Sequence, residues 1–113
     1  MLSCTKQNCK TSIFLRQLLA RANLQRADLA RAELFKTAFS SADLRNANLS
    51  LAYLQQANFR LARLQGAEFR DATGLDDADF HQAIYDNKAI WPTGFDPQSF
   101  GAKLSSNNSG YEV

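Results

Sequence analysis

The residues that could carry acid–base chemistry lie near one end of this sequence. His81, the single histidine, lies close to Asp77 and Asp79. An imidazole beside a carboxylate can act as a general base, so these three residues form a candidate catalytic cluster. However, His81 flanks an apolar residue of a regular repeat, at an outward position where charged side chains are usually just solvated. The sequence also has no glycine-rich phosphate loop or nucleophile elbow. We therefore expect no enzyme and name no catalytic residue.

Cys4 and Cys9 are the only cysteines. A structural zinc site needs roughly four convergent ligands, and two thiols with one distant histidine do not supply them. We interpret the pair as free thiols of a reducing compartment, with a disulfide or an intermolecular bridge as the alternative. No metal or other cofactor is expected.

The overall composition is that of one domain of ordinary size. The 113 residues are 45% hydrophobic and 21% charged, which fits a single folded unit. No apolar run approaches 18 residues, so no transmembrane helix and no membrane partner are expected. The residues before Thr11 are polar and basic, which predicts a cytoplasmic protein without a signal peptide.

A five-residue repeat runs from Ala22 to Tyr85. Its central large residues are Leu24, Leu29, Leu34, Phe39, Leu44, Leu49, Leu54, Phe59, Leu64, Phe69, Leu75, Phe80 and Tyr85. A small residue, nearly always alanine, lies two positions before each of them. Neither an α-helix with 3.6 residues per turn nor a strand with a period of two puts these residues on one side. The chain must therefore turn a corner every five residues.

Units such as Ala22-Asn23-Leu24, Ala27-Asp28-Leu29 and Ala57-Asn58-Phe59 resemble the A(D/N)LxX motif of the pentapeptide-repeat family. The repeat covers more than half of the chain. The resemblance implies an all-β solenoid, a right-handed quadrilateral β-helix of about three coils, with small and central residues pointing inward. The stretch from Tyr85 to Pro97 also resembles the tail of cyanobacterial members.

In such a coil, residues twenty positions apart lie above one another, about 4.8 Å apart. Phe39, Phe59 and Phe80 are then predicted to stack, once one extra residue between Asp71 and Gly74 is counted. We interpret this extra residue as a corner bulge in which Gly74 relieves backbone strain. This register puts Thr73 at the small inward position.

Both ends of the coil are expected to be covered. We predict a flexible N-terminus over 1–11, a capping helix over 12–20, the β-helix over 22–90, a C-terminal cap over 91–104 and a disordered tail over 105–113. A helix over 12–20 would cover the open edge of the first coil. The alternative is a degenerate coil in which Leu19 keeps the repeat register. Pro92 and Pro97 lack backbone donors, so we expect the sheet to stop there, with Trp91 and Phe95 covering the last coil.

Charge is unevenly distributed along the chain. Residues 1–36 are mainly basic and residues 66–87 mainly acidic, although the net charge is only +2. This pattern suits head-to-tail association or docking onto a charged partner. Some family members mimic DNA and bind type II topoisomerases, which is an alternative function, but that role asks for a long acidic rod. Direct nucleic-acid binding is not expected either, because no base-stacking platform is evident.

The most distinctive outward residues are apolar. Phe35, Leu51 and Tyr53 should cluster on one face, and Leu61 is a further outward apolar residue. Single exposed apolar residues are normal, whereas a cluster has the character of a partner site. We therefore predict a non-enzymatic scaffold of regulatory type that binds an unidentified protein partner. We expect it to be monomeric or weakly associated end to end.

Overall fold

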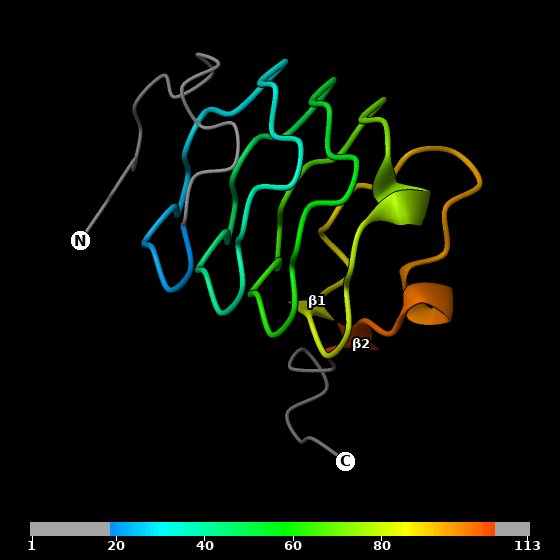
Figure 1. The fold of residues 1–113 in the computed structure, drawn as a ribbon. Coiled ribbons are helices and arrows are strands. Elements are labelled where there is room, and N and C mark those ends of the chain that lie inside the picture. Colours follow the sequence, from blue (N-terminus) through cyan, green and yellow to red (C-terminus); the bar gives the residue numbers. More distant parts are fainter. Residues whose placement is uncertain (1–18, 106–113) are drawn as a thin grey trace.

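The computed structural model describes residues 19–105. The chain forms stacked coils, and Figure 1 shows them following one another from blue to yellow, with an orange segment closing the last one. Residues 19–105 contain four regular elements, in the order η2 (Leu75–Asp77), β1 (Ile84–Tyr85), η3 (Pro97–Phe100) and β2 (Lys103–Leu104). The remaining sheet structure consists of isolated bridges, because each straight side of a coil is too short for a longer strand.

Parallel bridges join residues twenty positions apart, such as Asn23 with Asp43. The Leu24 N–H donates to the Asp43 carbonyl at 2.8 Å, and the Asp43 N–H donates to the Ala22 carbonyl at 3.0 Å. Similar bridges follow every five residues around the coil, which gives the coil four sides. Backbone pairing between coils therefore replaces the helix and strand ladders of ordinary domains.

We name the four sides by their central residues. Face A holds Leu24, Leu44, Leu64 and Tyr85; face B holds Leu29, Leu49 and Phe69; face C holds Leu34, Leu54 and Leu75; face D holds Leu19, Phe39, Phe59 and Phe80. We likewise call residues 19–38 coil 1, residues 39–58 coil 2 and residues 59–79 coil 3.

A tight turn forms each corner between two faces. In the first one, the Ala22 N–H donates to the Leu19 carbonyl at 3.0 Å, and Arg21 has a φ of 63°. A positive φ at the third residue is the mark of a type II turn. Eleven corner residues other than glycine have a φ between 57° and 65°. Their side chains point away from the interior, so core packing does not restrict which residue occurs at these positions.

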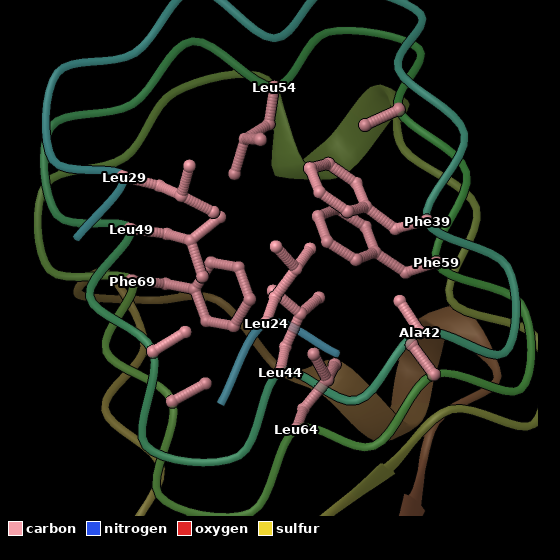
Figure 2. Close-up of a cluster of buried hydrophobic side chains, with 14 of the residues drawn as sticks. Leu24, Leu29, Phe39, Ala42, Leu44, Leu49, Leu54, Phe59, Leu64 and Phe69 are labelled. Carbon is pink, nitrogen blue, oxygen red and sulfur yellow. The ribbon is translucent and has the colours of Figure 1, made fainter. Parts of the chain in front are cut away.

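The interior is built from stacked side chains. All fourteen central residues of the four faces are buried. Phe59 lies flat against Phe39 and Phe80, with ring centroids 4.9 Å apart in both pairs and planes within 5° of parallel. Figure 2 shows the Phe39–Phe59 pair beside the leucine stacks of faces A and B. Burial of these columns is the main favourable term for the fold.

The extra residue lies in the expected stretch from Asp71 to Gly74, but the prediction that Thr73 points inward was wrong. Ala72 is the buried small residue, whereas Thr73 is exposed and bridges to Tyr53. The insertion is Gly74, which has a φ of 87° and precedes the 3-10 turn η2. Since the insertion follows the Ala72–Thr73 pair, that pair keeps the ordinary register and the chain bulges only afterwards.

The coil begins before Ala22. Leu19 is buried, and its N–H donates to the Ala38 carbonyl at 2.8 Å. Leu19 and Ala20 therefore belong to the repeat register, and the predicted helix was wrong at these two residues. The rest of the helix expected over 12–20 lies outside the described residues, as do the segment 1–11, Cys4 and Cys9.

A further unit follows Tyr85 after a second insertion. Ile90 bridges to Glu68, twenty-two residues earlier, and the Ile90 N–H donates to the Ala67 carbonyl at 3.0 Å. This pairing places Trp91 over Phe69, with ring centroids 4.7 Å apart and planes 5° from parallel. Trp91 therefore continues the stack of face B and also covers the end of the coil.

The sheet does not stop at the two prolines. β2 pairs in parallel with β1, and the Ser105 N–H donates to the Tyr85 carbonyl at 2.7 Å. Pro97 starts η3, where a missing N–H costs nothing, and the Asp96 carboxylate caps that turn by accepting from the Gln98 N–H. The chain can thus resume pairing at Lys103. The predicted tail over 105–113 lies outside the described residues except for Ser105, which is paired.

Candidate interaction face

Asp79, the acidic neighbour of His81, is bonded to the His81 backbone and to Arg60. The backbone N–H of His81 donates to Asp79 Oδ1 at 3.0 Å, while Arg60 Nη1 pairs with Asp79 Oδ2 at 3.1 Å. Burial raises the pKa of Asp79, but the His81 N–H bond and the Arg60 guanidinium outweigh it and hold the pKa below its usual value. Asp79 is therefore the ion-pair partner of Arg60. Asp77 lies apart, in η2.

A shallow pocket of about 250 Å³ lies between the bulge and the C-terminal cap, away from His81. It is lined by Ala72, Gly74, Leu75, Asp76, Pro92, Thr93, Gly94 and Phe95. Within residues 19–105, no three His, Cys, Asp or Glu side chains come together as metal ligands. The described residues also contain no helix long and apolar enough to span a membrane.

Face C carries the exposed aromatic pair. Phe35 follows Leu34 in coil 1, and Tyr53 precedes Leu54 in coil 2, so both side chains point outward. Their rings stack with centroids 6.3 Å apart and planes 25° from parallel. Phe35 is 38% exposed and Tyr53 is 44% exposed. The two rings shield one another only partly and leave a flat apolar surface that spans two coils.

The two exposed leucines lie at different corners. Leu51 forms the corner between faces B and C, so it borders the face that carries Phe35 and Tyr53. Leu61 forms the corner between faces D and A and is 54% exposed. The structure therefore brings three of the four outward apolar residues to one side, and it leaves Leu61 apart as an isolated exposed side chain.

Charged corners border face C at both ends. Arg31 and Lys36 flank it in coil 1, whereas Asp71 and Asp77 flank it in coil 3. The neutral Leu51 and Gln56 lie between them in coil 2. Sequence reasoning identified the basic and acidic halves of the chain but missed this alignment. The twenty-residue period, with Gly74 counted as the insertion, would have been enough to find it.

Face C also differs from the other three faces in its ion pairs. Arg45 pairs with Asp43 at 2.7 Å on face A, Arg70 pairs with Glu68 at 3.5 Å on face B, and Arg60 pairs with Asp79 on face D. Among residues 19–105, the charges that border face C have no ion-pair partner. These side chains are therefore available to an external surface of opposite charge.

On face A, the Arg45 side chain donates to both carboxylate oxygens of Asp43, from Nε at 2.8 Å and from Nη2 at 2.7 Å. This bidentate hydrogen bond is the main reason why the pKa of Asp43 lies below its usual value. Asp43 and Arg45 are thus satisfied within the chain, in contrast to the charges that border face C.

Comparison with known proteins agrees with this architecture. The family model for pentapeptide repeats matches residues 18–50 and 42–84. A pentapeptide repeat protein (Rfr23) from the cyanobacterium Cyanothece 51142 is 29% identical, with a TM-score of 0.65 over 67% of this chain and 51% of that one. The chain thus spans about half the length of the Cyanothece protein. Comparison with curated proteins found no match.

Two further solved structures are similar. A pentapeptide repeat protein from Nostoc Pcc 7120 is 30% identical, with a TM-score of 0.46 over 80% of this chain and 86% of that one. A pentapeptide repeat protein from the Arabidopsis thaliana thylakoid lumen is 23% identical, with a TM-score of 0.46 over 96% of this chain and 69% of that one. Proteins of this kind form right-handed quadrilateral β-helices.

Proposed function

Since the chain belongs to the pentapeptide-repeat family, we propose that it is a non-enzymatic scaffold of regulatory type whose face C binds a protein partner. The observation that supports this proposal is the exposed pair of stacked rings, Phe35 and Tyr53, with Leu51 at the adjacent corner. Aromatic side chains that lie flat on a surface supply large contact area at a low entropic cost, and they dominate the binding energy of many interfaces.

The charge pattern of the coil also favours partner binding over DNA mimicry. A DNA mimic needs acidic side chains along its whole length, whereas all four corners of coil 1 are basic, at Arg21, Arg26, Arg31 and Lys36. An enzymatic role finds little support, because His81 lies outside the pocket next to the bulge. We therefore propose no catalytic residue.

Affinity capture from the native host tests this function. The bait proteins are the wild type, the double variant Phe35→Ala/Tyr53→Ala and the control Leu61→Ala. All three substitutions remove exposed apolar side chains, so the baits should unfold within a few degrees of one another. We expect the double variant to lose proteins that the wild type and the control retain.

If Tyr53→Ala leaves every captured interaction intact, face C is not the binding site. Inhibition of gyrase supercoiling by the wild type would instead support the DNA mimic, because a partner scaffold predicts an unchanged supercoiling assay.

A further inference from the structure

The charges bordering face C make it complementary to itself. We propose that face C also binds a second copy of this chain, forming an antiparallel, two-fold symmetric dimer. This inference goes beyond the proposed partner binding, because it concerns the same chain and a defined geometry. The observation that supports the dimer is the order of charged and neutral side chains along the two corners of face C.

Each of these corners changes from positive through neutral to negative along the coil axis. One corner presents Arg31, Leu51 and Asp71 in coils 1, 2 and 3. Backbone bonds fix this order, since the Arg31 N–H donates to the Ser50 carbonyl at 2.9 Å and the Leu51 N–H donates to the Arg70 carbonyl at 2.9 Å. Successive members of the corner are therefore about one coil spacing apart, roughly 4.8 Å.

The opposite corner of face C has the same order. It presents Lys36, Gln56 and Asp77, where the Lys36 N–H donates to the Gln55 carbonyl at 3.0 Å. Asp77 occupies the third place because it precedes Ala78 as Gln56 precedes Ala57, and Asn58 bridges to Asp79. The two corners consequently run parallel, with both positive ends in coil 1.

Of the two-fold axes that run parallel or perpendicular to the coil axis, only the perpendicular one pairs opposite charges. In this arrangement the two-fold axis lies in the interface, runs at right angles to the coil axis and passes through coil 2. It places Arg31 opposite Asp71 of the second copy. The same rotation places Lys36 opposite Asp77. An axis parallel to the coil axis would instead place Arg31 opposite Lys36, which is repulsive. Charge complementarity therefore selects the antiparallel dimer.

The centre of this dimer is uncharged, with Leu51 and Tyr53 towards one corner of the face and Gln56 at the other. Because coil 2 lies on the axis, Leu51 meets Leu51 and Tyr53 meets Tyr53 of the second copy. Phe35 leans against Tyr53 within its own chain, which widens the apolar part of this centre. Glu33 bridges to Tyr53 and lies opposite Thr73 of the second copy, whose hydroxyl can donate to a carboxylate. An uncharged centre with charged edges is the usual composition of a specific interface.

The closed C-terminal end argues against the end-to-end association expected from the sequence. Trp91, Phe95 and η3 cover much of the last coil, which hinders docking of the first coil of another copy there. A head-to-tail contact would also repeat without closing and produce long chains, whereas a two-fold contact closes at two copies.

The dimer should be weak and sensitive to salt. A face three coils high extends only about 10 to 15 Å along the axis, so it buries less than the roughly 800 Å² per partner of stable complexes. Its four charge pairs are partly exposed and are screened at physiological ionic strength. The free chain therefore remains available to other partners at low concentration.

Sedimentation equilibrium at about 10 mM salt, where screening acts over about 30 Å, tests the proposal. We expect a monomer–dimer equilibrium that weakens at least tenfold at about 150 mM salt. The variant Arg31→Glu/Lys36→Glu should be monomeric. Its matched control is Arg21→Glu/Arg26→Glu, which changes the charge of the same coil by the same amount but leaves face C intact. The control should dimerise like the wild type.

The most discriminating test mixes two variants whose face C corners carry opposite charge. Asp71→Lys/Asp77→Lys makes both corners of face C basic in coils 1 and 3, and Arg31→Glu/Lys36→Glu makes them acidic. Each variant alone should be monomeric, while their equimolar mixture should form a heterodimer tighter than the wild-type dimer. Arg31, Lys36 and Asp71 have a positive φ that lysine and glutamine also adopt at other corners, and Asp77 lies in the 3-10 turn η2, so these changes fit the turns.

A monomeric wild type at low salt would overturn the proposal, as would a mixture that fails to associate. Equal loss of association in the Arg21/Arg26 control would overturn it in favour of an end contact. None of these outcomes bears on the capture of a different protein through Tyr53, so this inference and the proposed function can fail separately.

Discussion

The Trp91 indole lies flat on the Phe69 ring, with centroids 4.7 Å apart, and it continues a column that starts at Leu29. Its Nε1 is buried and donates no hydrogen bond to any described residue. The side chain therefore contributes by packing alone. We expect Trp91→Ala to lower the free energy of unfolding by about 3 to 5 kcal/mol.

Trp91→Phe is the matched variant, because it keeps the stack and gives up no hydrogen bond. Its cost should stay below about 1.5 kcal/mol, and chemical denaturation measures both values. Similar losses for the two variants would show that the stacked ring is not what closes the coil.

Phe59 is the middle member of the aromatic column on face D. Replacing it with alanine removes parallel contacts to both Phe39 and Phe80 and opens a cavity, at a cost of about 3 to 5 kcal/mol. Gln55→Ala removes a side chain whose one weak bond, to Thr73 Oγ1, is 3.4 Å long. Thermal unfolding should show a large shift for Phe59→Ala and a small one for Gln55→Ala. Equal shifts would contradict the register.

Alanine substitutions at Gly74 and Gly94 distinguish the cost of backbone strain from the cost of a steric clash. Both have nearly the same positive φ, 87° and 86°, so alanine at either position carries a similar conformational cost of about 1 to 2 kcal/mol. At Gly74 an added Cβ would also lie 2.5 Å from the backbone nitrogen of Gln55, whereas nothing lies within 4 Å at Gly94. Gly74→Ala should therefore lower the melting temperature clearly more than Gly94→Ala. A larger decrease in melting temperature for Gly94→Ala than for Gly74→Ala would contradict the assignment of Gly74 as the inserted residue.

The Asp43–Arg45 pair predicts a pH-dependent contribution to stability. Because the Arg45 hydrogen bonds lower the pKa of Asp43 in the folded protein, the stabilisation is present above the ordinary value of 3.8 and is lost as pH falls through the folded pKa. Asp43→Asn keeps the turn acceptor but removes the charge. Both side chains are partly exposed, so we expect a deficit of at most about 1 kcal/mol at pH 6.

That deficit should shrink towards zero below the folded pKa, which denaturation at a series of pH values measures. A deficit that persists unchanged at pH 2 would assign the effect of Asp43→Asn to packing rather than charge.

The core register could be predicted from the sequence because one rule governs it. A small residue and a large apolar residue recur every five positions, and Phe80 meets Phe59 once a single insertion is counted. The position of that insertion could not be predicted, since Ala72 and Thr73 are both small enough for the inward site. The structure distinguishes them through the bridge between Thr73 and Tyr53.

The last coil was harder to predict for a physical reason. The unit Ala89-Ile90-Trp91 has no Asp or Asn and follows a second insertion, so it does not match the repeat pattern. β2 contains only two residues, Lys103 and Leu104, which is too short for any alternation to show. Both segments join the sheet because the open edge of the preceding coil offers unpaired backbone groups.

The chemical character of face C depends on which residues the stacked coils bring together in space. Sequence reasoning identified Phe35, Leu51 and Tyr53 as a possible cluster, and the structure places them along one side of the coil. It could not show that Arg31 and Asp71 border the same side. The repeat therefore defines the scaffold, and we propose that its variable outward residues determine what the scaffold binds.

Photo-cross-linking tests most directly whether face C is the interaction surface. A benzophenone amino acid replaces Tyr53 in one variant and Leu61 in the other, and both are irradiated in lysate of the native host. We predict discrete adducts from position 53, including a dimer of this chain, and few or none from position 61. The same adducts from both positions, or adducts from position 61 alone, would contradict the assignment of binding to face C.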